Sequence, residues 1–406
     1  MKHWKALLII FVAAAMLALG YLLSSSRQYR VGFPLDDAWI HQTFARNLAE
    51  HGDWDYNPGE PSAGSTSPFW TLLLAVGCRL GIDHLVWAYL LGVMALSATG
   101  YTAYRYLCSC GMGMWRSLII SGLIFAEWHL VWSQVSGMEI LLLVLLALLV
   151  TVEALRGHPR WWLLGLLLGV AVWTRPDGIT LLAPVLWVWF LDHRADRPLK
   201  SLAALLLPVT VFTGLYLYLN NHLSGGLLPN TFSAKQQEYL ALLSQPFPGR
   251  TWNMLKTILA GPGILWLPGF LAGMVLSIQR RKISALAPYL WVAGYIFMYA
   301  VRLPVSYQHA RYLMPVLAVF MLFSVQPLID LSRRIKAGNT QFIVSRVYAV
   351  TLILVTLLFL AIGAGAYARD TAIIEQEMVD TAVWIDANTP ADTLIAAHDI
   401  GALGYF

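Results

Sequence analysis

The sequence is poor in charged residues. They make up 12% of the chain, whereas soluble globular domains carry about 25%. Hydrophobic residues make up 58%, and apolar runs of about 20 residues, the length that crosses a bilayer, recur along the chain. This composition excludes an ordinary soluble domain. It predicts an all-α polytopic membrane protein.

Other features are also missing. The three cysteines, Cys78, Cys108 and Cys110, provide neither a disulfide framework nor the second Cys/His pair that a zinc site needs. The Gly64-Ser-Thr-Ser stretch lacks the Gly-Lys-Ser/Thr ending of a P-loop. The net charge of +5 comes from basic residues in short loops, as membrane topology requires. We therefore expect no nucleic-acid partner.

Two choices set the topology. The first apolar run, Ala6–Leu23, is long for a signal peptide and has no clear cleavage site, so we interpret it as a retained helix. Pro68–Leu80 is short and Arg79 interrupts its end, so it is expected to lie in the outer leaflet without spanning. With these choices, every basic cluster falls on the cytoplasmic side. The result is about eleven spans, with juxtamembrane helices in a first outer loop over residues 24–84.

The predicted spans are Ala6–Leu23, Leu85–Leu107, Ser117–Ser133, Ile140–Leu155, Trp161–Trp173, Ile179–Leu191, Ser201–Leu219, Leu255–Ile278, Ile283–Val301, Tyr312–Leu331 and Val347–Tyr367. Residues 1–367 would form a transmembrane catalytic domain. Residues 368–406 are expected to open an extracytoplasmic α/β domain that is cut off, with an amphipathic helix over Glu375–Ala387 and a strand over Thr393–Ala397.

This topology gathers ionisable residues from separate loops at the outer face: Asp36, Asp37, His41, Arg46, Glu139, Arg175, Asp177, Lys235, Arg302, His309 and Arg311. Charges at the rim of an apolar bundle are costly unless paired, so they mark a candidate site. Carboxylates can accept a proton from a hydroxyl or hold a divalent cation, and basic side chains can hold a phosphate. Together they indicate group transfer from a lipid phosphate to a hydroxyl.

Structural roles remain open for several of these residues. Asp36 and Asp37 can cap a helix that starts after Pro34, and Glu139 can cap another. Arg175 and Asp177 can form an ion pair at a helix end, and Arg302 can extend toward the interface. His41 and His309 would then be supporting residues.

The motifs DDAWIHQTFARNLAEHG, YNPGEPSAGSTSPFW, SGME, TRPDG, LPNTFSAK, HARY and TLIAAHDIGALGYF follow one another along the chain. In this order they resemble the GT-C superfamily of polyprenyl-phosphate-dependent glycosyltransferases, in particular the bacterial branch around the mycobacterial terminal arabinofuranosyltransferase. The resemblance implies transfer of a sugar, for example a pentose such as arabinofuranose. The acceptor would be a hydroxyl of a cell-envelope glycan, lipid or protein, at the periplasmic face of the cytoplasmic membrane.

The resemblance also implies roles. Asp36 would be the general base of an inverting displacement, and Asp37 would orient it. Lys235 and Arg311 would bind the donor phosphate, together with Arg302 and Arg175. Glu139 matches the position of an acid that helps hold a metal in oligosaccharyltransferase-type relatives, but those have Asp-x-Asp or Asp-x-Glu where this chain has Gly-Met-Glu. Dependence on Mg, Mn or Ca, through Asp36 and Glu139, therefore stays open.

Two rival functions remain. A transporter or flippase for lipid-linked sugars would place charges within its spans, where Glu127 is the main example here, and often has two related halves. No second half repeats the first. An O-antigen-ligase-type enzyme typically has its key residues in a large late loop, which the early acidic pair disfavours.

Overall fold

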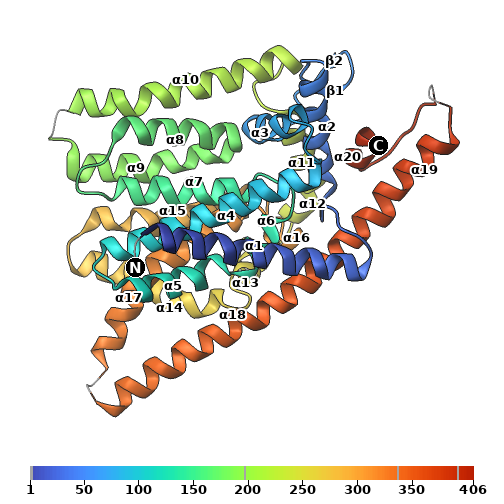
Figure 1. The fold of residues 1–406 in the computed structure, drawn as a ribbon. Helices are drawn as coiled ribbons and strands as arrows, with labels where there is room; N and C mark the ends of the chain where they lie inside the picture. Colours follow the sequence, from blue (N-terminus) through green and yellow to red (C-terminus); the bar gives the residue numbers. More distant parts are fainter. Residues whose placement is uncertain (1–2, 196–197, 336–337, 391–392) are drawn as a thin grey trace.

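The structure is a computed structural model that describes residues 3–195, 198–335, 338–390 and 393–406. It is a helical bundle with one small antiparallel hairpin (Figure 1). The elements of its first half are α1 (His3–Gln28), α2 (Asp36–Glu50), β1 (Asp55–Asn57), β2 (Glu60–Pro61), α3 (Pro68–Arg79), α4 (His84–Ser109), α5 (Met114–Phe125), α6 (Trp128–Gln134), α7 (Ile140–Ala154), α8 (Trp161–Thr174), η1 (Pro176–Leu181), α9 (Leu182–Val188) and η2 (Trp189–His193).

The elements of the second half are α10 (Pro198–Ser224), α11 (Asn230–Glu238), α12 (Leu240–Leu243), α13 (Phe247–Ile258), α14 (Gly263–Gln279), η3 (Ile283–Leu286), α15 (Ala287–Arg302), α16 (Tyr307–Ala310), η4 (Met314–Val316), α17 (Leu317–Arg334), α18 (Asn339–Ile373), η5 (Ile374–Val379), α19 (Asp380–Asn388) and α20 (Gly401–Tyr405).

Among the described residues, six helical stretches are long and apolar enough to cross a membrane, and the bent pair α13–α14 makes up to seven. Four shorter apolar helices, α3, α5, α7 and α8, accompany them. The protein is therefore a multi-pass helical membrane protein, which confirms the predicted fold class. Every predicted span overlaps helical structure, but the count of eleven stays a prediction.

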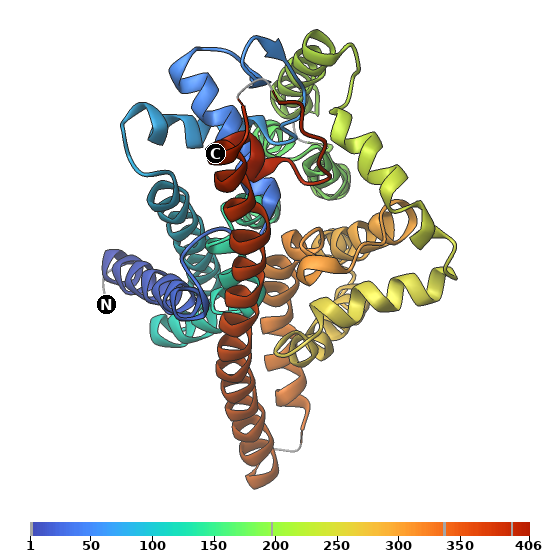
Figure 2. The ribbon, with the colours of Figure 1, turned by 90° about the vertical axis from the view of Figure 1, so that its right-hand side faces the viewer.

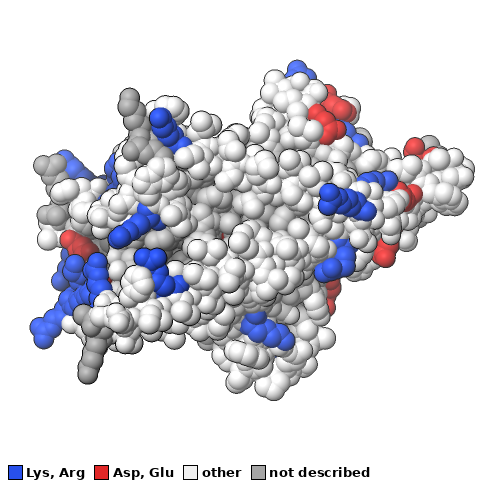
Figure 3. Space-filling view, turned by 60° about the horizontal axis from the view of Figure 1, so that its bottom comes forward, with Lys and Arg blue, Asp and Glu red and all other residues white. Residues whose placement is uncertain are grey.

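The bundle is built around α7. This helix packs on α4 and α8, and its side chains are buried on nearly all sides. In turn, α8 packs on α10 and α14 on α17, while α1 lies along α18. The turns before and after α2 and α3 lie at one end of the bundle, beside α20 (Figures 1 and 2). Lys and Arg side chains gather at the opposite end, which is on the left in Figure 3.

Two predicted spans are not continuous helices. The span over Leu255–Ile278 bends by 113° between α13 and α14. At the break, Gly261 has φ +74° and Pro262 follows, and proline has no N–H to continue a helix. The span over Ser117–Ser133 breaks because the Glu127 carboxylate accepts the backbone N–H groups of His129 and Leu130 and so begins a new helix, α6.

The C-terminal region also differs from expectation. The helix expected over Glu375–Ala387 is not separate, because helical structure runs without a break from Asn339 to Asn388, across the predicted domain boundary. The strand expected over Thr393–Ala397 is absent, since these residues pair with no strand in the described chain. A strand needs a partner strand for its backbone hydrogen bonds, and no strand within the described residues is paired with this one. The chain instead ends in α20, which packs on α2.

Candidate active site

A cavity of about 660 Å³ opens at the end of the bundle where α2 lies. Residues from seven separate short stretches of the chain line it. It brings together eight of the predicted site residues: Asp37, His41, Glu139, Arg175, Asp177, Lys235, Arg302 and Arg311. Asp36 and His309 are not among its lining residues.

The first charged cluster in the cavity joins Asp37, Arg311 and Lys235. The Arg311 guanidinium donates a short hydrogen bond to the Asp37 carboxylate, and Lys235 Nζ donates to the same oxygen at 3.2 Å. Burial alone would raise the pKa of Asp37, but these two cations hold it well below its usual range. Asp37 is therefore an ionised counter-ion.

Tyr312 lies among three cations, and the sequence analysis missed it. The charged groups of Arg311, Arg175 and Lys235 lie 5.1, 5.4 and 5.9 Å from the centre of its ring. The face of an aromatic ring attracts cations at this range. Its position directly after Arg311 in the HARY motif is the sequence feature that could have predicted Tyr312 as a site residue.

The second cluster is centred on Arg175. Its guanidinium donates to both carboxylate oxygens of Asp177, at 3.2 and 3.0 Å, and to the Tyr299 hydroxyl at 2.9 Å. The hydroxyls of Tyr295 and Tyr299 donate to Asp177. The Arg175–Asp177 ion pair thus exists and also lines the cavity. Both tyrosines were missed, although they are four residues apart and so lie on one face of α15.

Glu139 connects this cluster to α2. One carboxylate oxygen lies 3.9 Å from Arg175 Nε and the other 3.5 Å from His41 Nε2. Burial would raise the pKa of Glu139, but His41 and Arg175 keep it below its ordinary value. The turn before Glu139 depends on Gly137, which has φ +73° and whose Cβ, if present, would lie 2.5 Å from the Phe33 ring.

Local structure places Asp37 and Arg311. Asp37 lies in the first turn of α2, at the positive end of the helix dipole. Arg311 follows a turn in which Gln308, His309 and Ala310 all have positive φ, between 51° and 58°. Such a run is uncommon for residues other than glycine. It ends at the residue whose side chain binds Asp37.

His309 faces away from the cavity. Its Nε2 lies 2.7 Å from an Asp370 carboxylate oxygen, and its ring meets the edges of Trp128 and Trp132. Trp132 Nε1 also donates to Asp370, at 3.0 Å. These contacts fix the turn that precedes Arg311.

Asp36, the predicted base, is covered by the C-terminal segment. Its two carboxylate oxygens accept the backbone N–H groups of Gly401, at 2.6 Å, and Ala402, at 2.9 Å. Burial raises the pKa of Asp36, and the two N–H groups only partly oppose this. Arg46 holds the same segment, because its guanidinium donates to the carbonyls of Tyr405 and Gly404 at 2.6 and 3.1 Å.

A smaller cavity of about 330 Å³ adjoins the first. The two share the lining residues Ile40, Gly64 and Thr231. Ile400, next to the segment that covers Asp36, forms part of its wall.

The residues present do not fit a divalent cation. Within the described residues, no group of three or more His, Cys, Asp or Glu side chains is placed to hold one. Both Asp36 oxygens already accept N–H groups, and Glu139 lies next to the positive charge of Arg175. Their arrangement supplies too few free oxygen ligands.

The cavity contains unsatisfied polar atoms of both kinds. Arg311 is 6% exposed, yet its Nε and Nη1 have no hydrogen-bond partner in the described part of the chain. Oε2 of Glu139 has no hydrogen bond there either, but His41 Nε2 lies 3.5 Å from it. Buried polar groups are nearly always paired, so the free donors of Arg311 point to an anionic ligand.

The chain shares its fold with solved structures of ArnT and of an archaeal oligosaccharyltransferase. No family model and no curated protein sequence matches the chain. The solved structures that share its fold include ArnT from Cupriavidus metallidurans bound to undecaprenyl phosphate, with a TM-score of 0.65, 17% identity and coverage of 98% of this chain and 84% of that one. Apo ArnT matches with a TM-score of 0.63 and 15% identity, over 100% of this chain and 85% of that one.

A second protein has a similar fold. It is the archaeal oligosaccharyltransferase AglB from Archaeoglobus fulgidus, in complex with an inhibitory peptide and a dolichol-phosphate. The TM-score is 0.57 at 13% identity, over 96% of this chain and 58% of that chain.

Proposed function

We propose that this protein is a membrane glycosyltransferase that moves a sugar from a polyprenyl-phosphate donor to a hydroxyl group. The observation that carries the proposal is the buried guanidinium of Arg311, a residue that lines the cavity and has two donor groups without a hydrogen-bond partner among the described residues. A buried guanidinium with free donors calls for an anion, and phosphate suits its geometry. Lys235, beside it, adds a second positive charge.

The structures with a similar fold support a lipid-borne phosphate. ArnT was solved with undecaprenyl phosphate and AglB with a dolichol-phosphate. The acceptor would be a cell-envelope glycan, lipid or protein at the extracytoplasmic face. The sequence motifs favour a pentose such as arabinofuranose, and a hexose is the alternative to test.

In the proposed reaction, the bond between the anomeric carbon and the phosphate oxygen breaks. Its electron pair leaves with the phosphate, whose charge Arg311 and Lys235 stabilise. The acceptor oxygen bonds to the anomeric carbon from the opposite face, which inverts the configuration. The acceptor proton passes to a carboxylate.

Asp36 is the proposed base, and Asp37 is the counter-ion of the donor-binding cations. The raised pKa of Asp36 makes it the better proton acceptor, whereas the pKa of Asp37 is lowered by its cations. The acceptor would approach through the smaller cavity. Its hydroxyl would share or replace the N–H groups of Gly401 and Ala402 on Asp36.

The experiment uses the full chain in lipid nanodiscs with a panel of synthetic polyprenyl-phosphate pentoses and hexoses. Donor binding and sugar transfer are measured separately. Arg311→Ala is expected to abolish donor binding. Asp36→Asn is expected to bind donor and to lose about 10²–10⁴-fold in transfer rate. Arg333→Ala, which changes an exposed arginine at the other end of the bundle, is the matched control.

Other outcomes would contradict the proposal. Undiminished donor binding by Arg311→Ala would remove the phosphate site. Full transfer by Asp36→Asn would move the base to Asp37 or Glu139. Movement of lipid-linked sugar across vesicles without any transfer product would establish the transporter alternative.

A further inference from the structure

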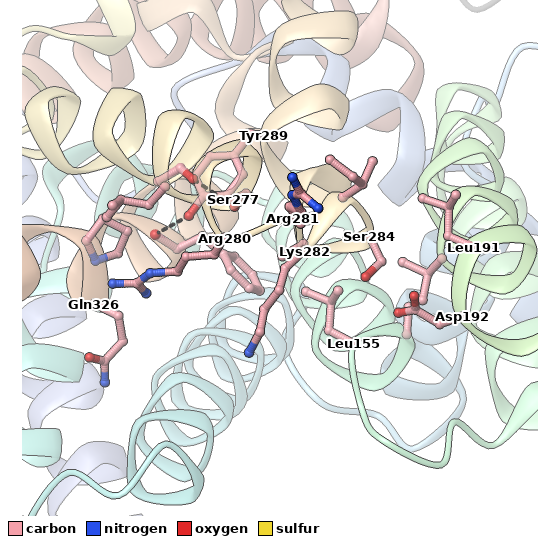
Figure 4. A pocket seen from close by; sticks show the side chains of 18 of the residues that line it. Leu155, Leu191, Asp192, Ser277, Arg280, Arg281, Lys282, Ser284, Tyr289 and Gln326 are labelled. Atoms are coloured by element: carbon pink, nitrogen blue, oxygen red, sulfur yellow. Dashed lines mark hydrogen bonds between the residues drawn. The ribbon is translucent and has the colours of Figure 1, made fainter.

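A second large cavity, of about 730 Å³, lies at the other end of the same helices (Figure 4). The helix α7 shows the relationship: its first residue, Ile140, lines the candidate active site, and its last, Ala154, lines this second cavity. The helices α15 and α17 also extend from one end toward the other. The second cavity is therefore separate from the proposed chemistry.

Four basic side chains and two acidic ones line this cavity: Arg156, Arg280, Arg281, Lys282, Asp192 and Asp330. Two of the basic groups are neutralised by acids, Arg280 by Asp330 at 2.7 Å and Arg156 by Glu153 at 3.1 Å. Arg281 and Lys282 have no acidic partner within 4.0 Å among the described residues. The cavity thus has an excess of positive charge.

The backbone at Arg281 adds an independent observation. It follows the end of α14 and has φ +55°, a conformation that favours glycine at helix C-termini. The N–H groups of Arg281 and Lys282 bond back to the carbonyls of Ile278 and Ser277, which fixes the turn. The chain therefore holds a guanidinium where its backbone favours a residue without a side chain.

The remaining walls are largely apolar. Leu155, Leu191, Leu276 and Phe323 line the cavity next to the basic turn. Figure 4 shows the Lys282 side chain extending into the space between the Arg280 side and the wall that carries Leu191 and Asp192. Positive charge beside apolar walls, at the end of membrane-spanning helices, matches the chemistry of a phospholipid: an anionic headgroup with acyl chains below it.

We propose that this cavity binds the phosphate headgroup of an anionic membrane lipid, with Arg281 and Lys282 as its charged contacts. The tendency of basic residues to lie in cytoplasmic loops explains, without any ligand, why they gather at this end of the bundle. It does not explain why these two exposed cations lie beside apolar walls in one cavity. The occupant is taken to be a lipid because the cavity combines that charge with apolar walls.

The test is a lipid titration of the full chain, delipidated in neutral detergent and followed by native mass spectrometry. The probes are phosphatidylglycerol, zwitterionic phosphatidylcholine and inorganic phosphate. The variant is the double substitution Arg281→Gln/Lys282→Gln. Its matched control is Arg333→Gln/Arg334→Gln, which removes two exposed charges from the same end outside the cavity. Thermal unfolding checks that both variants are folded, and Lys282→Gln alone serves if the double variant is not.

We expect saturable binding of phosphatidylglycerol in preference to phosphatidylcholine. Each basic residue near a membrane surface contributes about a fivefold factor, so the double variant should lose roughly tenfold or more in affinity and the control should change little. Equal losses in both variants, or no preference between the two lipids, would overturn the proposal. If millimolar inorganic phosphate displaced bound phosphatidylglycerol as well as added lipid does, the ligand would be a soluble phosphate. That result would also overturn the proposal.

Discussion

Arg311 and Asp37 are 274 positions apart in the sequence, yet the guanidinium donates directly to the carboxylate. Lys235 reaches the same oxygen from a third part of the chain. Asp37 therefore neutralises the two cations that we propose hold the donor phosphate. A phosphate entering this site has to share the cations with Asp37 or displace it.

The first prediction concerns this competition. Asp37→Asn is expected to bind polyprenyl phosphate roughly tenfold more tightly, because two partly buried cations lose their fixed anion. The same loss should lower the free energy of unfolding by about 1–3 kcal/mol. Ligand binding and thermal unfolding in one detergent measure both effects. Asp386→Asn, an exposed aspartate on α19, is the control. Weaker phosphate binding by Asp37→Asn would show that Asp37 assists the ligand instead of competing with it.

The second prediction is that the two adjacent aspartates make opposite pH-dependent contributions to stability. The pKa of Asp37 is lowered, so its stabilising contribution is present above the unfolded value of about 3.9 and is lost as the pH falls through the folded pKa. The pKa of Asp36 is raised, so its contribution is present below about 3.9 and is lost as the pH rises through the folded pKa.

Unfolding midpoints of Asp36→Asn and Asp37→Asn between pH 7 and pH 3 test this. Relative to the unsubstituted protein, Asp36→Asn should remove a gain in stability that appears on acidification above about pH 4. Asp37→Asn should lessen the loss of stability below that pH. Two variants with the same pH profile as the unsubstituted protein would contradict the assignment of both shifts.

Eight of the ten site residues predicted from the sequence line one cavity, and Asp36 and His309 do not. Their placement on one side of the membrane follows from the basic loops, so Glu139, Arg175, Lys235 and Arg311 could be grouped without any contact being known. The acidic start of α2 could be predicted from Pro34 and the two carboxylates that follow.

Other features depend on contacts that local patterns do not encode. The Asp36 carboxylate accepts a hydrogen bond from the N–H group of Gly401, 365 positions away. No periodic pattern in the sequence predicts that contact. The place of Tyr312 among three cations also needs the fold. The bend at Gly261 and the capping by Glu127 carry local signals, but the surrounding apolar residues favour one continuous helix. At both positions the local signal that ends a helix outweighs the apolar pattern that favours a continuous one.

The third prediction tests the cover over Asp36. A Cβ at Gly401 would lie 2.1 Å from the Asp36 carbonyl oxygen, and a backbone atom cannot yield as a flexible side chain can. Gly401→Ala should therefore displace the terminal segment and speed amide hydrogen exchange in residues 400–406 and in the first turn of α2. Gly214→Ala is the control, because its Cβ would meet nothing within 4 Å. Unchanged exchange in Gly401→Ala would mean that the segment does not depend on this close contact.

The fourth prediction concerns the left-handed turn before Arg311. Gln308 has φ +51°, which costs a non-glycine residue about 1–2 kcal/mol. Gln308→Gly should therefore raise the free energy of unfolding, by up to about 1 kcal/mol after the added freedom of the unfolded chain is allowed for. The matched control is Gln237→Gly in the helix α11, where glycine is expected to cost about 1 kcal/mol.

Donor binding gives this last test a functional readout. The turn orients Arg311. His309 fixes the turn through its contacts with Asp370 and the two tryptophan rings. His309→Gln should weaken binding of polyprenyl phosphate, because the turn becomes less well fixed. Adding Gln308→Gly to that variant should restore part of the affinity, because glycine relieves the backbone strain of the turn. Because neither side chain lines the cavity, a direct contact with the ligand cannot account for that restoration. If His309→Gln leaves donor binding unchanged, or if the glycine weakens it further, the turn does not position Arg311.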